Sequence, residues 1–510
     1  MPSFEKTFIF ENSPFEQYVA ENEPNILNYA VVPPYFEVAK KRAATPSTHI
    51  LFGARGAGKS ATRLSTEREL WKNVAEGKKV PLPVQLINFS NLIDNDSVES
   101  VTSAGIIKEL SFSVIETLLL WISDQEEGAE MVDLLEEGEL TLLLALSKAF
   151  YLNVPEANRR VSHETAMKVL RQNWPSKTVI WVEKRWAAIS QLVGELSSNF
   201  LTKKIETRDL SAEISGLLTK EGGIFSGTAV LSKLVEIARV FGFSGISVFV
   251  DKVDEHPRTQ NSPKDSAKLI HPIISEVQLM EVEGLGWQFF LWDRIRPFFE
   301  NGDLSIRLDK LAHSEVSWTP VFLVSMIDAR LSFFSDQRLK SFSELTSNDF
   351  DVNAKVSEII KLAGGSPREV IRLLDTVVRE FDAKYAAHEE LHFLSSEDLD
   401  AGMDKYVSDV IWSIYDRIVL SQVLRLGKTV FINKDLQEAF KISPPGATNR
   451  IVKWEACGAV KLTGTRAAEG AVGGKPSNEY SIADPRIVRL AERNLYDPNA
   501  LTEAPPVITD

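Results

Sequence analysis

The sequence contains very little cysteine and no long apolar run. Its 510 residues include one cysteine, Cys457, so an internal disulfide is excluded, and no Cys/His cluster has the spacing of a zinc site. Residues 1–17 are mixed and acidic, without the apolar stretch of a secretory signal. The longest apolar stretch, around residues 117–122, is far too short to span a membrane. We therefore expect a soluble cytoplasmic protein without a membrane partner.

Positive charge is also scarce. The chain carries 57 Lys and Arg against 71 Asp and Glu, a formal net charge of −14. A surface that is basic throughout is therefore excluded, and any contact with nucleic acid has to come from a local patch. The apolar fraction of 44% is sufficient for well-formed cores, and the length favours two to four domains.

Short apolar runs alternate with helical patterns along the first half of the chain. The runs predict strands at residues 49–52, 84–89, 246–250, 287–291 and 305–308. Because helices separate these strands, we expect an α/β fold with a parallel sheet covered by helices on both faces. Apolar residues at helical spacing between the second and third strands predict a helical insertion in this core. The clearest such residues are Ile106, Ile107, Leu110, Val114 and Ile115, and later Val182, Trp186, Ile189, Leu192, Val193 and Leu196.

The second half of the chain has a helical pattern that ends in two short strands. Helices are expected at 321–334, 356–362, 368–381, 410–424, 434–440 and 445–457, and strands at 459–463 and 479–482. Three helices followed by a β-hairpin are the winged-helix pattern. The predicted parts are an N-terminal arm (1–45), a core (46–315) with its insertion (about 95–222), a helical lid (316–395), a winged helix (396–490) and a disordered tail (491–510).

A phosphate-binding loop directly follows the first predicted strand. Its sequence, Gly-Ala-Arg-Gly-Ala-Gly-Lys-Ser, satisfies G-x-x-x-x-G-K-[ST] and precedes a predicted helix. The glycines let backbone N–H groups converge on phosphates, Lys59 places a cation at the β- and γ-phosphates, and the Ser60 hydroxyl suits Mg²⁺. Arg55 in the loop and Arg63 on the following helix are expected to face solvent or phosphate. The predicted ATP-binding residues are Gly53, Ala54, Arg55, Gly56, Ala57, Gly58, Lys59, Ser60 and Ala61.

An acidic residue ends the third predicted strand. Asp251 follows Ile-Ser-Val-Phe-Val and is expected to hold Mg²⁺ through water. The next position is Lys252, which cannot act as a base. The water-activating carboxylate is therefore expected from the acidic pair that follows, with Glu255 as the first choice and Asp254 as the alternative.

These motifs together resemble a known group of proteins. The phosphate loop, the segments VFVDKVDE and GGSPREVIRLLD, and the C-terminal winged helix are similar to those of AAA+ and STAND P-loop ATPases. The lid and winged helix resemble the origin-recognition type of AAA+ ATPase, and the displaced acidic pair resembles the NACHT-like STAND pattern. The motifs cover about half of the chain.

The resemblance implies further sites. Arg368, in the Gly-Gly-Ser-Pro-Arg turn that opens a lid helix, would be the second sensor and would reach the γ-phosphate. Asp293, after the fourth strand, would be the first sensor and would orient the attacking water. The candidates for an arginine finger acting on a neighbouring subunit are Arg294, Arg296 and Arg330.

The C-terminal region differs from the rest of the chain in its charge. Residues 408–490 contain 12 Lys and Arg but 8 Asp and Glu. Arg450 and Lys453 lie on the third helix of the predicted winged helix, and Arg466 and Lys475 flank the wing, where they could contact DNA. Winged helices of STAND ATPases also serve as protein-interaction modules, so a protein partner remains an alternative.

Three functions are compatible with these patterns. The first is an ATP-hydrolysing switch that acts as a homo-oligomer or on an effector protein; by resemblance, such architectures often belong to bacterial defence or stress systems. The second is a DNA-associated ATPase of the origin-recognition type. The third is a nucleotide-binding scaffold that hydrolyses ATP poorly.

Overall fold

The computed structural model describes most of the chain. The described residues are 4–20, 23, 26–93, 97–125, 128–155, 158–159, 223–347, 349–388, 390–466 and 476–496. They form two compact units, Val19–Ser317 and Met1–Tyr18 together with Trp318–Asp510. None of the helices in the described ranges combines the length and the apolar character needed to cross a lipid bilayer.

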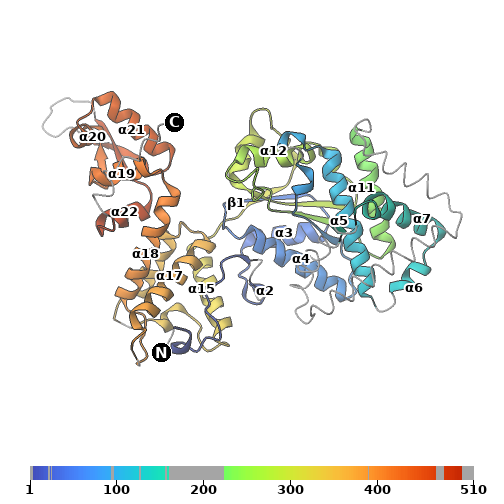
Figure 1. Ribbon diagram of the computed structural model, residues 1–510, viewed down its shortest axis with the longest axis horizontal. Helices are drawn as coiled ribbons and strands as arrows, with labels where there is room; N and C mark the ends of the chain where they lie inside the picture. The colour runs from blue at the N-terminus through green and yellow to red at the C-terminus, as the bar shows by residue number, and fades with distance from the viewer. Residues whose placement is uncertain are drawn as a thin grey trace. The chain divides into compact units, whose positions relative to one another are not determined.

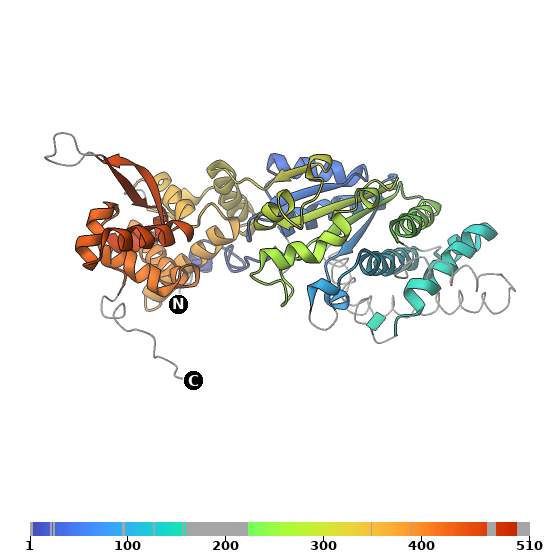
Figure 2. The same ribbon diagram turned by 90° about the horizontal axis from the view of Figure 1, so that it is seen from above.

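A five-stranded parallel sheet lies at the centre of the unit Val19–Ser317. Its strand order is β2-β3-β4-β1-β5, so β4 lies between β1 and β3. Helices cover both faces, with α3 (Pro34–Ala44) and α4 (Lys59–Ala75) on one face and α12 (Pro263–Ile274) on the other (Figures 1 and 2). The strands are β1 (His49–Gly53), β2 (Leu82–Leu86), β3 (Ile246–Val250), β4 (Leu285–Trp292) and β5 (His313–Glu315).

The central strands are continuous apolar runs because helices cover both sides of them. Every residue of β1, β3 and β4 is buried. The sequence-based expectation of a strand at 305–308 is wrong, since Leu308–Lys310 is a 3₁₀ turn and the last strand is β5. Strand β5 has the polar sequence His-Ser-Glu and lies at the sheet edge, so it carries no apolar pattern that could reveal it.

In the described residues, the predicted helical insertion begins with the 3₁₀ turn Val98–Ser100, which four longer helical segments follow. Ile106, Ile107, Leu110, Val114 and Ile115 are all buried on α5, so their spacing was correctly interpreted. The expected helical residues from Val182 to Leu196 lie outside the described residues, as does the end of the predicted tail. The segments are α5 (Ser103–Asp124), α6 (Gly128–Asp133), α7 (Glu137–Leu146) and the π-helix η5 (Ser147–Leu152); α11 (Gly223–Val240) leads back into the sheet.

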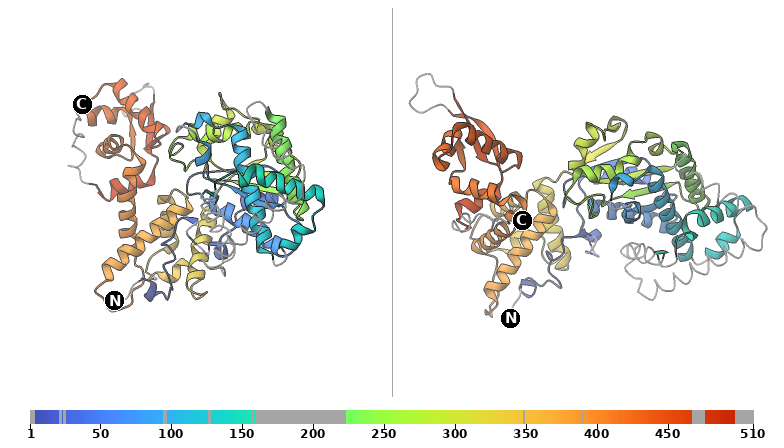
Figure 3. Two further views of the ribbon diagram at one scale, coloured as in Figure 1. Left: turned by 45° about the vertical axis from the view of Figure 1, so that its right-hand side comes forward. Right: turned by 45° about the horizontal axis from the view of Figure 1, so that its top comes forward.

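The second unit combines a helical layer with a winged helix. Figure 3 shows the short helices and the hairpin of the winged helix at the orange and red end of the colour bar. The hairpin strand β8 also pairs with β6, giving a three-stranded antiparallel sheet. The helical layer contains α15 (Pro320–Phe334), α16 (Val352–Leu362), α17 (Pro367–Tyr385) and α18 (Ser396–Ile414). The winged helix contains α19 (Arg417–Leu426), β6 (Val430–Ile432), α20 (Asn433–Phe440), α21 (Pro444–Ala456), β7 (Val460–Arg466), β8 (Ser477–Ile482) and α22 (Pro485–Glu492).

The single helix expected at 410–424 is in fact two helices. Helix α18 ends at Ile414, and α19 starts at Arg417. The Asp416 side chain accepts hydrogen bonds from the backbone N–H groups of Ile418 and Val419, at 2.8 and 3.2 Å. Asp416 is therefore the N-cap of a new helix, which the continuous amphipathic pattern concealed.

The start of the chain packs into the helical unit. Helix α1 (Phe4–Thr7) begins with a fully buried phenylalanine, whose backbone N–H donates to Asp382 Oδ1 at 2.7 Å. Arg330 is 2% exposed and donates to the backbone oxygens of Pro14, at 2.7 Å, and Gln17, at 3.1 Å. Arg330 thus holds the N-terminal segment in place and is unsuited to act as an arginine finger on a neighbouring subunit.

A buried arginine joins the winged helix to the helical layer. Arg489 of α22 donates to Asp404 at 2.7 Å, Glu358 at 2.6 Å and Asp400 at 3.0 Å. These acids lie on α16 and α18. Because charge-assisted hydrogen bonds of this kind are the strongest in proteins, Arg489 fixes α22 against both helices.

His49 is a buried titratable group at the start of β1. It is 2% exposed, and its Nε2 lies 3.0 Å from Ser314 Oγ on β5. Burial, followed by the nearby charges of Arg42 and His313, lowers the pKa of His49 to about 4. The folded chain therefore holds this imidazole neutral at pH values where an unfolded chain would protonate it.

This difference predicts an acid sensitivity of the Val19–Ser317 unit. Below pH 6.5 the unfolded state binds a proton at His49, whereas the folded state binds it only near pH 4. The free energy of unfolding therefore decreases as the pH is lowered from about 6.5 to about 4. We expect a loss of about 2 kcal/mol between pH 7.5 and pH 5 from this residue alone. Urea unfolding at both pH values should show a smaller loss in His49→Gln, whereas exposed His388→Gln should behave like the wild type. An equal loss in His49→Gln and the wild type would contradict the assignment.

Candidate nucleotide-binding site

The phosphate loop has the backbone geometry that its sequence predicts. It connects the buried strand β1 to α4, and Gly58 is the N-cap of that helix. Gly56 and Gly58 have φ angles of 76° and 90°, which residues with a Cβ rarely adopt. At Gly53, an added Cβ would lie 2.8 Å from Val316 Cγ2, so a larger residue does not fit. The loop therefore presents backbone N–H groups and a helix N-terminus, which together suit a phosphate.

Lys59 lies along the inside of this loop. Its side chain is largely buried, and Nζ donates to the backbone oxygens of Gly53 at 2.9 Å and Ala54 at 3.0 Å. The loop backbone therefore positions the ammonium group beside the helix N-terminus. A cation in this place can contact the phosphates of a nucleotide.

The acidic end of β3 lies at the same edge of the sheet as the loop. All five strands are parallel, so their carboxyl ends meet at one edge, which is where open α/β sheets bind ligands. In the sheet register, Gly53 of β1 is opposite Trp292 of β4, and Val250 of β3 is opposite Phe289. The loop–helix connection, this parallel sheet and the winged helix confirm the predicted P-loop α/β fold class.

The oxygen groups at this edge have the chemistry that Mg²⁺ prefers. Ser60 offers a hydroxyl and Asp251 a carboxylate, and Mg²⁺ is commonly bound by one or two such groups together with phosphates. The described part of the chain contains no group of three or more His, Cys, Asp or Glu that could hold a metal ion. A hydroxyl and a carboxylate are donors of the kind that hold Mg²⁺ together with a nucleotide.

Asp251 is paired with an arginine that the sequence placed at the surface. Arg63 is 1% exposed, so the expectation that it faces solvent or phosphate is wrong. Its Nε donates to Asp251 Oδ2 at 2.9 Å, and the backbone N–H of Lys252 donates to Oδ1 at 2.9 Å. The Arg63–Glu67 spacing of four residues on one helix indicated that the two side chains could pair, but it did not indicate that the pair is buried.

The two carboxylates proposed to activate water have different surroundings. Asp254 is buried and accepts a 2.7 Å hydrogen bond from Arg55 Nε, while its backbone oxygen accepts one from the same guanidinium at 2.8 Å. Arg55 also stacks on Trp292, with its Cζ 4.3 Å from the ring centre. Glu255 has a 57% exposed side chain and lies 3.9 Å from Lys252 Nζ. Asp254 is thus tied to the phosphate loop, whereas Glu255 reaches solvent.

The sensor and finger candidates after β4 also differ from one another. Asp293 is exposed and starts the 3₁₀ turn Asp293–Ile295 directly at the carboxyl end of β4. Arg294 lies beside Trp292, with Cζ 5.6 Å from the ring centre. Arg296 is paired with Glu300, at 2.7 Å, and with Glu315. Asp293 thus lies at the carboxyl edge of the sheet, and its role in orienting water stays a prediction.

Arg368 belongs to the other compact unit. It is the second residue of α17, whose N-cap Ser366 accepts a hydrogen bond from the Glu369 N–H at 3.5 Å. The two preceding glycines, Gly364 and Gly365, have φ angles of 60° and 69°, which the tight turn from α16 requires. The turn is as predicted, and the sensor role of Arg368 stays a prediction.

Two arginines of the winged helix surround one aromatic ring. The guanidinium of Arg450 lies 4.3 Å and that of Arg425 5.9 Å from the centre of Phe440. The buried Nη1 of Arg450 makes no hydrogen bond to the described residues. Burial, and then the charge of Arg425, lowers the pKa of Arg450 below its ordinary value. Two cations held together in this way favour an anion between them.

The other basic candidates of the winged helix are less suited to bind an anion or are not described. Arg466 is paired with Glu479, its Nε lying 2.6 Å from Oε1. Lys453 is exposed on α21, and Lys475 lies outside the described residues. The observed basic feature is therefore the Arg425–Arg450 pair, of which the sequence analysis had named one member.

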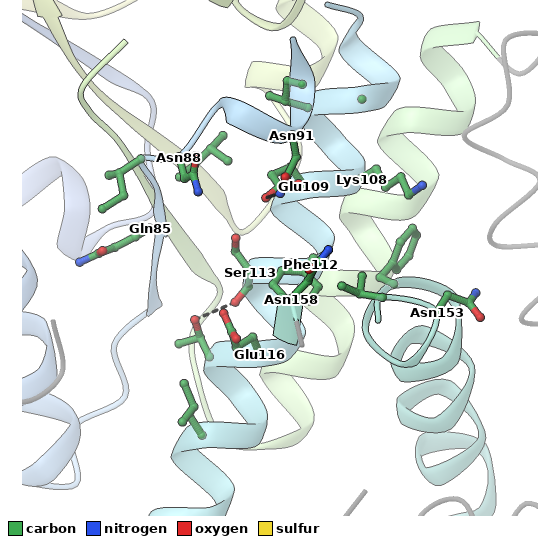
Figure 4. Close-up of a pocket in the computed structure, with 18 of the residues that line it drawn as sticks. Gln85, Asn88, Asn91, Lys108, Glu109, Phe112, Ser113, Glu116, Asn153 and Asn158 are labelled. Atoms are coloured by element: carbon green, nitrogen blue, oxygen red, sulfur yellow. Dashed lines mark hydrogen bonds between the residues drawn. The ribbon is translucent and has the colours of Figure 1, made fainter. Parts of the chain in front are cut away.

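A cavity of about 780 Å³, lined by both polar and apolar side chains, lies between β2 and α5. Figure 4 shows Gln85 and Asn88 on one side of it, Glu109 and Glu116 on α5, and Asn91 beside Glu109. Burial raises the pKa of Glu109, which accepts a 3.2 Å hydrogen bond from Asn91. None of the phosphate-loop residues lines this cavity, so it is separate from the candidate nucleotide site.

Comparisons with known proteins give only remote structural likenesses. No family model matches the chain, and no curated protein matches it. The Aeropyrum pernix ORC1 protein, solved in complex with DNA, is 12% identical, with 93% of this chain and 97% of that chain covered and a TM-score of 0.34. The Aeropyrum pernix ORC2 protein, solved as ADPNP-ADP complexes, is 9% identical, with 92% of this chain and 97% of that chain covered and a TM-score of 0.36. Drosophila ORC bound to DNA is 11% identical, with 95% of this chain and 92% of that chain covered and a TM-score of 0.30. The fold class therefore rests on the chain's own strand order and loop geometry.

Proposed function

We propose that this chain binds ATP together with Mg²⁺ at residues 53–60 and hydrolyses it. The observation that carries the proposal is the loop geometry. A G-x-x-x-x-G-K-S loop with left-handed glycines joins a buried parallel strand to a helix. The acidic residue Asp251 ends another strand at the same edge. This combination supplies both a phosphate site and oxygen ligands for the cation.

Each group at the edge has one role in this proposal. Lys59 and the loop N–H groups bind the β- and γ-phosphates, and Ser60 and Asp251 hold the cation, which would neutralise phosphate charge when bound. Glu255 orients and deprotonates the attacking water, because its carboxylate is accessible. Asp254 keeps Arg55 in place, since a buried carboxylate that is ion-paired with an arginine is poorly available as a base.

Three variants separate binding from hydrolysis. Lys59→Ala should weaken binding of Mg-ATP at least tenfold, because it removes a charge-assisted contact to phosphate of about 1.5–3 kcal/mol. Glu255→Gln should bind ATP like the wild type but lose turnover on the order of a hundredfold or more. Asp254→Asn should alter ATP binding and turnover moderately, because Asp254 keeps Arg55 in place.

Calorimetric titration and phosphate release measure these two properties. Unchanged affinity in Lys59→Ala would contradict the nucleotide assignment. Wild-type turnover in Glu255→Gln would move the base elsewhere, and negligible turnover in the wild type would leave a nucleotide-binding scaffold.

The proposed switch depends on the helical lid. Arg368 would contact the γ-phosphate, which ATP has and ADP lacks, so the contact can favour one lid position only before hydrolysis. Tyr406 of α18 donates to Glu369, the neighbour of Arg368, at 2.6 Å. Arg489 then joins α18 to α22. A lid movement would therefore carry the winged helix with it.

A change at Arg368 should remove this coupling. Arg368→Ala should lower turnover strongly and ATP affinity only modestly, and it should erase the difference in protease sensitivity near Ser396 between ATP analogue and ADP. Arg372→Ala is the matched control, because Arg372 is an exposed arginine on the same helix. Limited proteolysis with each nucleotide decides the matter. A mutant that keeps the nucleotide-dependent pattern would show that Arg368 is only a surface residue.

A second candidate function is DNA binding by the winged helix. It is favoured by the Arg425–Arg450 pair beside Phe440, because the buried Nη1 of Arg450 has no hydrogen-bond acceptor in the described part of the chain. A backbone phosphate would supply that acceptor and neutralise the pair. In this case the chain would be a DNA-associated ATPase rather than a switch that acts on protein partners.

This candidate predicts a salt-dependent DNA affinity. Arg450→Met keeps an apolar contact with Phe440 but loses the charge, and should weaken binding to duplex DNA and reduce the slope of log affinity against log salt by about 1. Lys434→Met, a change of an exposed lysine on α20, should have a smaller effect. Fluorescence anisotropy over a salt series measures both quantities. Absence of DNA binding by the wild type would favour a protein partner.

A further inference from the structure

A buried polar chain runs from the end of β3 through α4 to β2. Arg63 of α4 donates from Nε to Asp251 at 2.9 Å and contacts Glu67 through Nη1 at 3.3 Å. Gln85 of β2 donates from Nε2 to both carboxylate oxygens of Glu67, at 2.6 Å each. Arg63 and Glu67 are almost completely inaccessible to solvent, as is Asp251. One guanidinium is therefore shared between two buried carboxylates.

The sharing matters because only one of the two carboxylates lies at the candidate Mg²⁺ site. A guanidinium next to Asp251 partly neutralises the charge that would attract a divalent cation, and it repels that cation directly. Glu67 also attracts the Arg63 guanidinium and thereby weakens its interaction with Asp251. Gln85 in turn stabilises Glu67, so that Glu67 depends less on Arg63.

We propose that Glu67 and Gln85 set the Mg²⁺ requirement of nucleotide binding by controlling how strongly Arg63 holds Asp251. They are positioning residues, since they act through Arg63 and Asp251. This inference rests on the proposed ATP site. It goes beyond that site by assigning a role to the side of α4 that faces β2.

The direction of each effect follows from the charges. In Glu67→Gln, Arg63 loses the Glu67 carboxylate and acts more strongly on Asp251, so more Mg²⁺ should be needed. In Gln85→Met, Glu67 loses two hydrogen bonds and competes harder for Arg63, so less Mg²⁺ should be needed. The two variants should therefore shift the Mg²⁺ requirement in opposite directions, which a general loss of stability would not do.

The experiment measures binding of a fluorescent ATP analogue to the full chain while Mg²⁺ is raised from an EDTA-buffered baseline. The midpoint Mg²⁺ concentration in Glu67→Gln should rise on the order of fivefold, the lower end of typical coupling between sites. Glu69→Gln should leave it unchanged. Glu69 lies on the same helix but is 40% exposed and paired with Lys40. Both variants replace one carboxyl group of α4 with an amide, so the control tests the position of the change.

A double variant tests the path through Asp251. Asp251→Asn should remove most of the Mg²⁺ dependence, and Glu67→Gln added to it should cause no further shift. A shift that persists without Asp251 would overturn the inference, as would equal midpoints in Glu67→Gln and the wild type or binding that is independent of Mg²⁺ in the wild type. If Glu67→Gln does not fold, the lowered midpoint in Gln85→Met carries the test. Failure of the wild type to bind the analogue at all would instead refute the proposed function.

Discussion

A buried guanidinium connects the phosphate-loop helix to the central sheet. Arg63 stands between Asp251 and Glu67 in an interior where an unpaired charge would cost several kcal/mol. Its two partners come from the end of β3 and from its own helix, and Gln85 of β2 completes the set. These contacts, together with the buried apolar residues of α4, fix α4 over the sheet and with it the loop at its start. Removing any one partner would leave another buried polar group without compensation.

The parallel sheet brings the phosphate loop and Asp251 to the same edge. Because β4 lies between β1 and β3, the loop and Asp251 belong to strands separated by one neighbour, and their carboxyl ends meet at the same edge. Arg55 adds a second link at that edge through Asp254 and Trp292. Charged side chains thus hold the candidate nucleotide site in place where backbone pairing ends.

Buried arginines also hold the segments of the second unit together. Arg489 joins α22 to three acidic residues on α16 and α18, and Arg330 holds the N-terminal segment through backbone oxygens. Both arginines are buried with several acceptors. The helical layer and the winged helix are therefore suited to move as one piece, which is the property that a nucleotide-driven lid would need.

The sequence alone determined the features that are written in local patterns. The apolar runs of β1, β3 and β4 and the glycine spacing of the phosphate loop identified the sheet and the candidate site, because strand burial and left-handed turns restrict the residue types directly. The lid helices and the hairpin were found from the spacing of their apolar residues. Polar β5 and the break at Asp416 were missed, since edge pairing and a side-chain cap leave no apolar pattern.

Only the tertiary structure decided what the charged residues do. Arg63, Arg330 and Asp254 carry no sign in the sequence that distinguishes a buried partner from a solvated side chain. Burial of Arg63 depends on Asp251, which lies far away in the chain, and the ion pair of Asp254 depends on Arg55. Electrostatic roles are set by distances between segments brought together in folding, and those distances are not encoded in local residue order.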